Sequence, residues 1–255
     1  MPELPEVETI VNDLKKKIVG RKITGVWFDT PKMIKIILGA DKRGLDAEIR
    51  GMKIVDVKRR GKNILIYLNS KASPLAGGLN LKILLVHQKM TGHLLYGKWG
   101  LKCGDKNITL HLRSSIRCNK KQKVISLIKG VLEEKVNNYI HFILYLDNGW
   151  QVGLSDLRKF AKILFGPKEE IENLKEIKNL GPEPLDESFK VDKFLSSISS
   201  QKRKIKQVLM DQNVIAGIGN IYSDEILWQA KVHPFRKANE LRVNELKNLY
   251  IAMKE

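Results

Sequence analysis

The spacing of apolar residues changes once along this 255-residue chain, and the change restricts the fold more than any other feature. Up to about residue 178, short runs rich in Ile, Val and Leu alternate with turn residues, which is typical of β-strands. Leu180–Leu185 (LGPEPL) then interrupts regular structure with one glycine and two prolines, and beyond it the spacing becomes helical. The sequence therefore predicts an α+β protein with a β-rich part followed by a helical part.

The β-rich part contains many short runs at close spacing, and this favours an antiparallel β-sandwich or barrel over a βαβ fold. A turn at residues 147–149 (Asp-Asn-Gly) separates the last two runs. The expected strands are Lys22–Phe28, Met33–Leu38, Ile54–Lys58, Asn63–Leu68, Lys82–Val86, Ile140–Leu146 and Gln151–Leu154.

An amphipathic helix is expected at the start of the chain, because apolar residues recur there at helical spacing until Gly20: Val7, Ile10, Val11, Leu14 and Ile18. The helical part should contain Asp192–Ser199, Lys202–Asp211, Asn220–Ala230 and Val243–Lys254. We expect a β-sandwich domain at 1–178, a linker at 179–190 and a helical domain at 191–255.

The net charge of +18 indicates a polyanionic partner, with nucleic acid favoured over a generally lysine-rich composition. Residues 98–135 carry ten Lys or Arg against three Asp or Glu, and we expect an inserted basic loop there. A DNA contact and a solvated insertion without function are equally supported for that loop. The acidic start, the absence of a long apolar run and the two cysteines predict a soluble cytoplasmic protein without a disulfide framework.

The first residues, MPELPEVETI, combine prolines and carboxylates beside a helix start. Removal of Met1 is expected because proline is small, and Pro2 would then carry a secondary amine. A terminal amine has a reference pKa of about 8, against about 10.4 for lysine, and in its neutral form it can attack an aldehyde-level carbon. Glu3 is close enough in sequence to act as a general acid or base. The alternative is that these residues only begin a helix, and spacing alone leaves both interpretations open.

A second motif lies between two predicted helices, where Gly217, Gly219 and Asn220 follow a turn-rich stretch. Such glycines allow backbone N–H groups and a helix N-terminus to approach a phosphate. The upstream run Gln201–Lys206 (QKRKIK), which includes Lys202, adds four cations. Together these features indicate binding of a DNA backbone.

Two other stretches carry cations near strand ends. In RRGKNIL, Lys62 is placed as a phosphate ligand would be, although a solvated turn is the alternative. In HQKMTGHL, His87 and Lys89 could bind phosphate and Met90 could lie at an exposed loop tip, whereas the alternative is a strand end with a core methionine.

In SDLRKFA, Arg158 and Phe160 alternate on an apparent strand edge. A cation beside an aromatic ring suits insertion into a base stack. The alternative is that Phe160 is an ordinary core residue.

These motifs occur in the order found in bacterial formamidopyrimidine-DNA glycosylases, which the chain resembles over nearly its whole length except residues 98–135. The resemblance rests on MPELPEVETI, RRGKNIL, HQKMTGHL, SDLRKFAKI, LGPEPL and LMDQNVIAGIGNIYSDEIL followed by HPFR. The first and last of these are highly specific. Leu4 favours this family over the related Nei branch, which prefers oxidised pyrimidines and typically begins Pro-Glu-Gly-Pro-Glu.

The resemblance implies base-excision repair by a bifunctional DNA glycosylase and AP lyase that removes oxidised purines such as 8-oxoguanine and formamidopyrimidines. It implies that Pro2 attacks C1′ of the damaged nucleoside and forms a Schiff base, after which β- and δ-elimination cut the strand. Glu3 and Lys62 are implied as catalytic residues, and Glu6 as a second acidic residue near the site.

The resemblance also implies a duplex DNA partner, with oxidised or abasic sites, bound by a monomer between a β-sandwich and a helix-two-turn-helix domain around Gln212–Gly219. The implied phosphate ligands are Lys62, His87 and Asn220. Met90, Arg158 and Phe160 are implied to fill the gap left by the flipped nucleotide. Further DNA contacts are expected at Lys89, Lys202, Gly217 and Gly219.

The family usually ends in a zinc finger with two CxxC pairs, and this segment would lie beyond residue 255. We therefore expect no metal ligand and no cofactor in this chain, and Cys103 and Cys118 have the wrong spacing for zinc. Two alternatives stay open: a protein that binds damaged or abasic DNA with impaired catalysis, and a Nei-like glycosylase for oxidised pyrimidines. The preferred lesion and the opposite base do not follow from the sequence.

Overall fold

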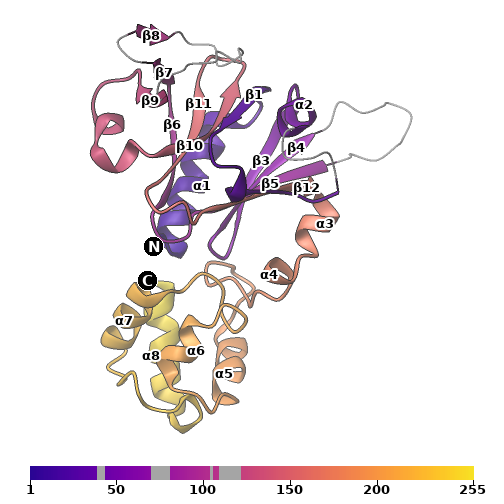
Figure 1. Ribbon diagram of the computed structural model, residues 1–255. Helices are drawn as coiled ribbons and strands as arrows, with labels where there is room; N and C mark the ends of the chain where they lie inside the picture. The colour runs from indigo at the N-terminus through magenta and orange to yellow at the C-terminus, as the bar shows by residue number, and fades with distance from the viewer. Residues whose placement is uncertain (39–43, 70–80, 104–105, 109–121) are drawn as a thin grey trace. The chain divides into compact units, whose positions relative to one another are not determined.

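The computed structural model describes residues 1–38, 44–69, 81–103, 106–108 and 122–255 (Figure 1). Its contacts divide the chain into two compact units. The first unit comprises Met1–Pro2, Glu8–Lys58 and Asn63–Glu172, and the second comprises Glu3–Val7, Arg59–Lys62 and Asn173–Glu255. Two short segments from the early part of the sequence therefore belong to the helical second unit.

The first unit contains two larger β-sheets. One has the strand order β1 (Ile23–Phe28), β10 (Ile140–Leu146), β11 (Gln151–Asp156) and β6 (Gly92–Gly97), and its neighbours are antiparallel. The other has the order β2 (Ile34–Ile36), β12 (Lys162–Pro167), β5 (Leu81–His87), β4 (Asn63–Asn69) and β3 (Lys53–Arg60). In this sheet β12 is antiparallel to β5 but parallel to the edge strand β2. The pairing of β12 with β2 is a parallel exception in the predicted antiparallel sandwich, because a long connection lets the chain return in the same direction.

The central strands of both sheets bury side chains on both of their faces. Every residue of β11 is buried, and β5 and β10 bury long continuous runs. This burial is expected for strands that are covered on both sides, because alternate side chains point to opposite faces of a sheet. The predicted α+β class, with a sandwich and an N-terminal helix, is confirmed.

A third, smaller sheet lies within residues 98–135, where the sequence predicted an irregular loop. It consists of β7 (Trp99–Cys103), β8 (Lys106–Ile108) and β9 (Gln122–Ser126), and the short helices η3 (Val131–Glu133) and η4 (Lys135–Asn137) follow it. The prediction is wrong for these residues because Trp99 is buried against Ile140 and Ile143 of β10 and holds β7 to the core. Residues 104–105 and 109–121 of the segment, which include Cys118, lie outside the described residues.

Helix α1 (Leu4–Ile18) has the predicted apolar face, because Val7, Val11, Leu14 and Ile18 are all buried. Gly20, with φ of +87°, ends the helix in the left-handed region that favours glycine. The other short helices in this half of the chain are η1 (Pro31–Met33), α2 (Leu45–Ile49) and α3 (Lys168–Glu172).

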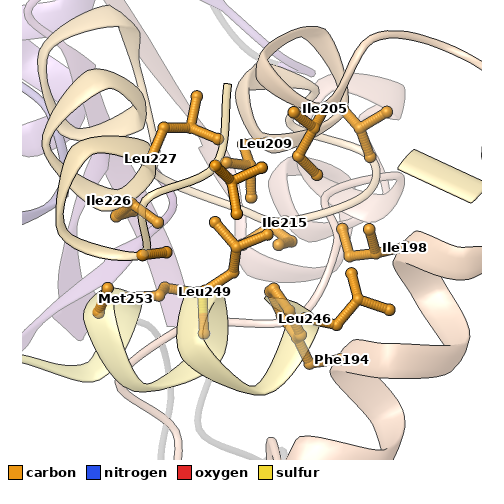
Figure 2. Close-up of a cluster of buried hydrophobic side chains, with 14 of the residues drawn as sticks. Phe194, Ile198, Ile205, Leu209, Ile215, Ile226, Leu227, Leu246, Leu249 and Met253 are labelled. Carbon is orange, nitrogen blue, oxygen red and sulfur yellow. The ribbon is translucent and has the colours of Figure 1, made fainter. Parts of the chain in front are cut away.

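The second unit is helical and has its own hydrophobic core, to which residues such as Phe194, Leu209 and Leu249 contribute (Figure 2). Its helices are α4 (Lys175–Lys178), α5 (Val191–Ser199), α6 (Ile205–Met210), α7 (Asn220–Gln229), η5 (Ala238–Glu240) and α8 (Val243–Lys254). Among the described residues, no helix has the length and apolar character needed to cross a membrane.

Helix α6 begins at Ile205, so the prediction of a helix from Lys202 is wrong at its start. The preceding residues are extended and pair with a distant segment. The N–H of Ala238 donates to the carbonyl of Arg203 (2.9 Å), and the N–H of Ile205 donates to the carbonyl of Arg236 (2.8 Å). These backbone bonds replace the first helical turn.

Candidate active site at the chain start

The carboxylate of Glu3 caps the N-terminus of helix α7, from which it is separated by 216 residues in the sequence. Its oxygens accept hydrogen bonds from the backbone N–H groups of Gly219 (2.8 Å), Ile221 (3.0 Å) and Tyr222 (3.2 Å). These N–H groups have no partner inside the helix, and α7 has no acidic residue in its own first turn. Glu3 is 2% exposed, so a buried negative charge is held by three backbone donors and by the positive end of the helix.

The two glycines before α7 are required by the close approach of the chain start. A Cβ atom on Gly219 would lie 2.4 Å from Oε1 of Glu3, and one on Gly217 would lie 2.7 Å from Cδ1 of Leu4. Gly217 also has φ of +93°, and its carbonyl accepts a hydrogen bond from the N–H of Leu4 (3.1 Å). The sequence interpretation was that these glycines admit a phosphate, whereas here they admit Glu3 and Leu4. Their contact with DNA stays a prediction.

Glu6 also connects the start of the chain to helix α7. Its carboxylate accepts hydrogen bonds from the N–H of Glu3 (2.9 Å) and from the hydroxyl of Tyr222 (3.0 Å). Burial, followed by the hydrogen bond to Glu6 and its charge, raises the pKa of Tyr222, so its hydroxyl stays a proton donor. Sequence reasoning did not select Tyr222, although it lies two residues after Asn220 in the GIGNIYSDEIL motif.

Lys62 lies in the turn between β3 and β4 and is 7% exposed. Burial lowers the pKa of its ammonium group, while the negative charges of Glu3 and Glu6 act in the opposite direction. The structure thus places Lys62 in the field of the two carboxylates predicted with it. Pro2 is joined to Glu3 by its peptide bond and is half-buried.

The residues predicted to insert into DNA lie on two connections of the first unit and are exposed. Met90, between β5 and β6, is 47% exposed, and Phe160, between β11 and β12, is 52% exposed. The exposed guanidinium of Arg158 lies over the Phe160 ring, 4.6 Å from its centroid. The expectation of a strand edge for Arg158 and Phe160 is wrong, because β11 ends at Asp156 and the chain then turns, with φ of +58° at Lys159.

Asp156 holds these two connections together. It is completely buried, and its carboxylate accepts hydrogen bonds from the hydroxyl of Thr91 and from the N–H groups of Ala161 (2.8 Å) and Arg158 (3.2 Å). Burial raises the pKa of Asp156, but these hydrogen bonds more than offset it, so the pKa lies below its usual value. Sequence reasoning missed Asp156, which is part of the SDLRKFA motif.

The remaining predicted DNA contacts lie on the surface or at a strand end. His87 ends β5, and its Nδ1 accepts a hydrogen bond from the N–H of Lys89 (3.0 Å). Asn220 is the exposed first residue of α7, and Lys202 is also exposed. Within the described part of the chain, no group of three or more His, Cys, Asp or Glu is placed to hold a metal ion.

Two family models cover the chain almost from end to end. The formamidopyrimidine-DNA glycosylase N-terminal domain matches residues 1–163, and the formamidopyrimidine-DNA glycosylase H2TH domain matches residues 180–255. The chain therefore belongs to the formamidopyrimidine-DNA glycosylase family, as its motifs predicted.

Individual relatives agree with this assignment. The formamidopyrimidine-DNA glycosylase of Herpetosiphon aurantiacus is 34% identical over 256 residues, which cover 100% of this chain and 76% of the relative. The one from Streptococcus mutans is 32% identical, with 98% of this chain and 74% of the relative covered.

Among solved structures, a MutM protein in complex with DNA containing carbocyclic 8-oxo-G has a TM-score of 0.73 at 27% identity, covering 99% of this chain and 77% of that one. Lactococcus lactis Fpg in complex with DNA containing FAPY-dG has a TM-score of 0.72 at 26% identity, again covering 99% and 77%.

Proposed function

We propose that this protein is a DNA glycosylase of base-excision repair that removes oxidised purines and cuts the resulting abasic site by its AP lyase activity. The observation that carries the proposal is the capping of α7 by Glu3, because it fixes the residue next to Pro2 in a buried, hydrogen-bonded position. Family membership and relatives solved with 8-oxo-G, FAPY-dG or abasic DNA support the same substrate class.

The reaction begins once Met1 has been removed and Pro2 carries a free secondary amine. The amine nitrogen attacks C1′ of the damaged nucleoside, and the C1′–N bond to the base breaks, so the base leaves with the bonding electrons and takes up a proton. The nitrogen then loses its proton, its lone pair forms a C=N bond to C1′, and the C1′–O4′ bond opens. The oxygen O4′ receives a proton.

Strand cleavage uses the resulting iminium ion as an electron sink. Loss of a proton from C2′ expels the 3′ phosphate, and loss of a proton from C4′ expels the 5′ phosphate. Water then hydrolyses the C=N bond and releases the amine, so no oxidant or reductant is consumed. Glu3 carries protons between the amine and O4′, since it is the carboxylate adjacent to Pro2. Lys62 supplies a cation for a phosphate next to the lesion.

Binding of the duplex is assigned to the surface residues. His87 and Asn220 contact phosphates near the lesion, and further contacts come from Lys89 and Lys202. The high net charge of +18 attracts the DNA before these specific contacts form. Met90, Arg158 and Phe160 fill the space of the flipped nucleotide, for which their exposure suits them.

Borohydride trapping tests the proposal, because borohydride reduces a Schiff base to a stable amine. The chain is mixed with a duplex carrying one 8-oxoguanine or one abasic site, beside a Pro2→Gly variant, and mass spectrometry verifies the loss of Met1. We expect an adduct on both duplexes that is lost or much reduced in the variant. No adduct despite DNA binding would instead indicate a binding protein, and faster excision of an oxidised pyrimidine would indicate a Nei-like preference.

A further inference from the structure

Glu183, in the LGPEPL segment, binds three donors from the Arg59–Lys62 turn, by which we mean the last two residues of β3 and the two residues that follow them. Its Oε1 accepts hydrogen bonds from the N–H of Gly61 (2.6 Å) and from Nη1 of Arg60 (3.0 Å), and its Oε2 accepts one from Nη1 of Arg59. The side chains of Arg59 and Glu183 are only 6% and 18% exposed, so water competes weakly for these bonds.

The backbone of the same segment also binds the turn. The guanidinium of Arg60 donates to the carbonyl of Gly181 (2.8 Å) and to that of Leu180. A Cβ atom on Gly61 would lie 3.3 Å from Cδ1 of Leu180, and Gly61 has φ of +55°. The residue before Lys62 is therefore fixed by a hydrogen bond, by packing and by its own backbone conformation.

The electrostatics require an anion at this place. Arg59, Arg60 and Lys62 put three positive charges into four residues, and like charges this close repel one another. Glu183 lies between the two guanidinium groups and binds both, which offsets part of that repulsion. Its carboxylate holds the turn in a conformation that its own charges would disfavour.

We propose that Glu183 is a positioning residue of the reaction, which fixes the Arg59–Lys62 turn so that the Lys62 ammonium keeps its position within the unit that also holds Glu3 and Glu6. The inference rests on the proposed function, in which Glu3 and Lys62 act on the substrate, while Glu183 acts only through the turn. A displacement of a reacting group by about 1 Å can cost on the order of 100-fold in rate. We expect a loss of about tenfold for Glu183→Ala and a smaller loss for Glu183→Gln, which keeps a neutral acceptor for Gly61.

The chain contains a matched control in Glu245 of α8. Its carboxylate also accepts hydrogen bonds from an arginine, Arg236, and from a backbone N–H, that of Arg242 (2.8 Å). Both carboxylates belong to the second unit, but Glu245 binds Arg236 and Arg242, whereas Glu183 binds the turn. The comparison of Glu183→Ala with Glu245→Ala thus separates positioning of Lys62 from general stabilisation of the unit.

The experiment measures two quantities in both variants and in the unchanged chain. One is the rate of borohydride trapping on an abasic duplex at saturating protein, together with the dissociation constant for that duplex. The other is amide hydrogen exchange of the peptide containing Gly61. For Glu183→Ala we expect slower trapping, equal or tighter DNA binding because a negative charge is lost, and faster exchange confined to the turn.

Several outcomes would overturn the inference. One is trapping by Glu183→Ala at the unchanged rate, and another is an equal loss in Glu245→Ala. If the unchanged chain itself forms no adduct, the proposed function fails, but hydrogen exchange still tests whether Glu183 fixes the turn. Faster exchange of the turn in Glu183→Ala alone supports that role, and unaltered exchange rejects it.

Discussion

The two groups of candidate residues differ in how the fold holds them. Glu3 and Lys62 are almost completely buried, and every oxygen of the Glu3 carboxylate has a backbone donor. Met90 and Phe160 are about half exposed on connections between strands. A group that handles protons and charge needs a fixed, satisfied environment, whereas a group that replaces a base in the stack needs free apolar surface. Substitutions in the buried group should therefore alter the chemistry, and those in the exposed group should alter the use of duplex DNA.

The largest effect is expected for Glu3→Gln. General acid–base catalysis contributes on the order of 10² to 10⁴-fold, so trapping on an abasic duplex should fall by at least about 100-fold. An amide is also a poorer cap for α7 than a carboxylate, and the loss of a cap costs about 1 kcal/mol, which calorimetry should detect as a lower Tm. Glu8→Gln on the same helix serves as the control and should trap normally. Normal trapping by Glu3→Gln would remove Glu3 from the chemistry.

A second large loss of activity is expected for Lys62→Met, but this substitution should raise the stability of the fold, whereas Glu3→Gln should lower it. Trapping should fall on the order of tenfold or more because the phosphate loses its cation, while replacement of a buried ammonium by an apolar group should stabilise the fold by on the order of 1 kcal/mol. Because burial lowers the pKa of Lys62, the folded chain holds this proton less tightly than the unfolded chain. The free energy of unfolding of the unchanged protein should thus increase as pH rises from the lowered pKa of Lys62 in the folded state to the usual value of about 10.4. Denaturant unfolding at several alkaline pH values should show this gain in the unchanged protein and not in the variant.

Phe160→Ala should show that the exposed residues act on duplex DNA and not in the chemical steps. Excision of 8-oxoguanine from a duplex should fall about tenfold because unstacking is no longer compensated, whereas trapping on a single-stranded abasic oligonucleotide should stay unchanged. The free energy of unfolding should change by no more than about 0.5 kcal/mol, as is usual for surface positions. Leu157→Ala removes a similarly exposed apolar side chain from the same connection and should affect neither substrate. Equal losses on duplex and single strand would argue against insertion.

The smallest effect on activity is expected for Asp156→Asn. This substitution weakens the hydrogen bonds that hold the β5–β6 and β11–β12 connections together, but it leaves the side chains of Met90 and Phe160 in place. The rate of excision from duplex DNA should fall only a few-fold. The variant loses part of the energy of one hydrogen bond to a charged group, because the other contacts of residue 156 remain. Because the pKa of Asp156 is lowered in the folded protein, its contribution to stability is complete above the unfolded pKa of about 3.9 and is lost as pH falls through the lower folded value. Acid unfolding curves of the unchanged protein and the variant should therefore converge at low pH. Curves that stay apart there would show that the carboxylate charge is not what holds the connections.

Local sequence patterns predicted elements well where the partners of the backbone are also local. Helix α8 has the predicted bounds, Val243–Lys254. Strand β10 also has its predicted bounds, Ile140–Leu146, although one of its two partners is the distant strand β1, because a continuous apolar run ends there at a turn. The start of α6 was mispredicted because residues 203–205 bond to a segment near residue 236. The strand character of β7 was missed for a similar reason, since Trp99 is held by contacts with β10.

The sequence by itself determined the family and the fold class, and it predicted the candidate reactive residues, because these follow from motif order, periodicity and side-chain chemistry. Only the tertiary structure decided what those residues bind. Glu3 caps α7, Glu6 binds Tyr222, and Glu183 holds the turn of Lys62, and each pair is far apart in the chain. Nearly all of their partners are backbone N–H groups or ordinary polar side chains, whose spacing in the sequence carries no signal. Such bonds are strong only where folding has removed water and brought donor and acceptor together.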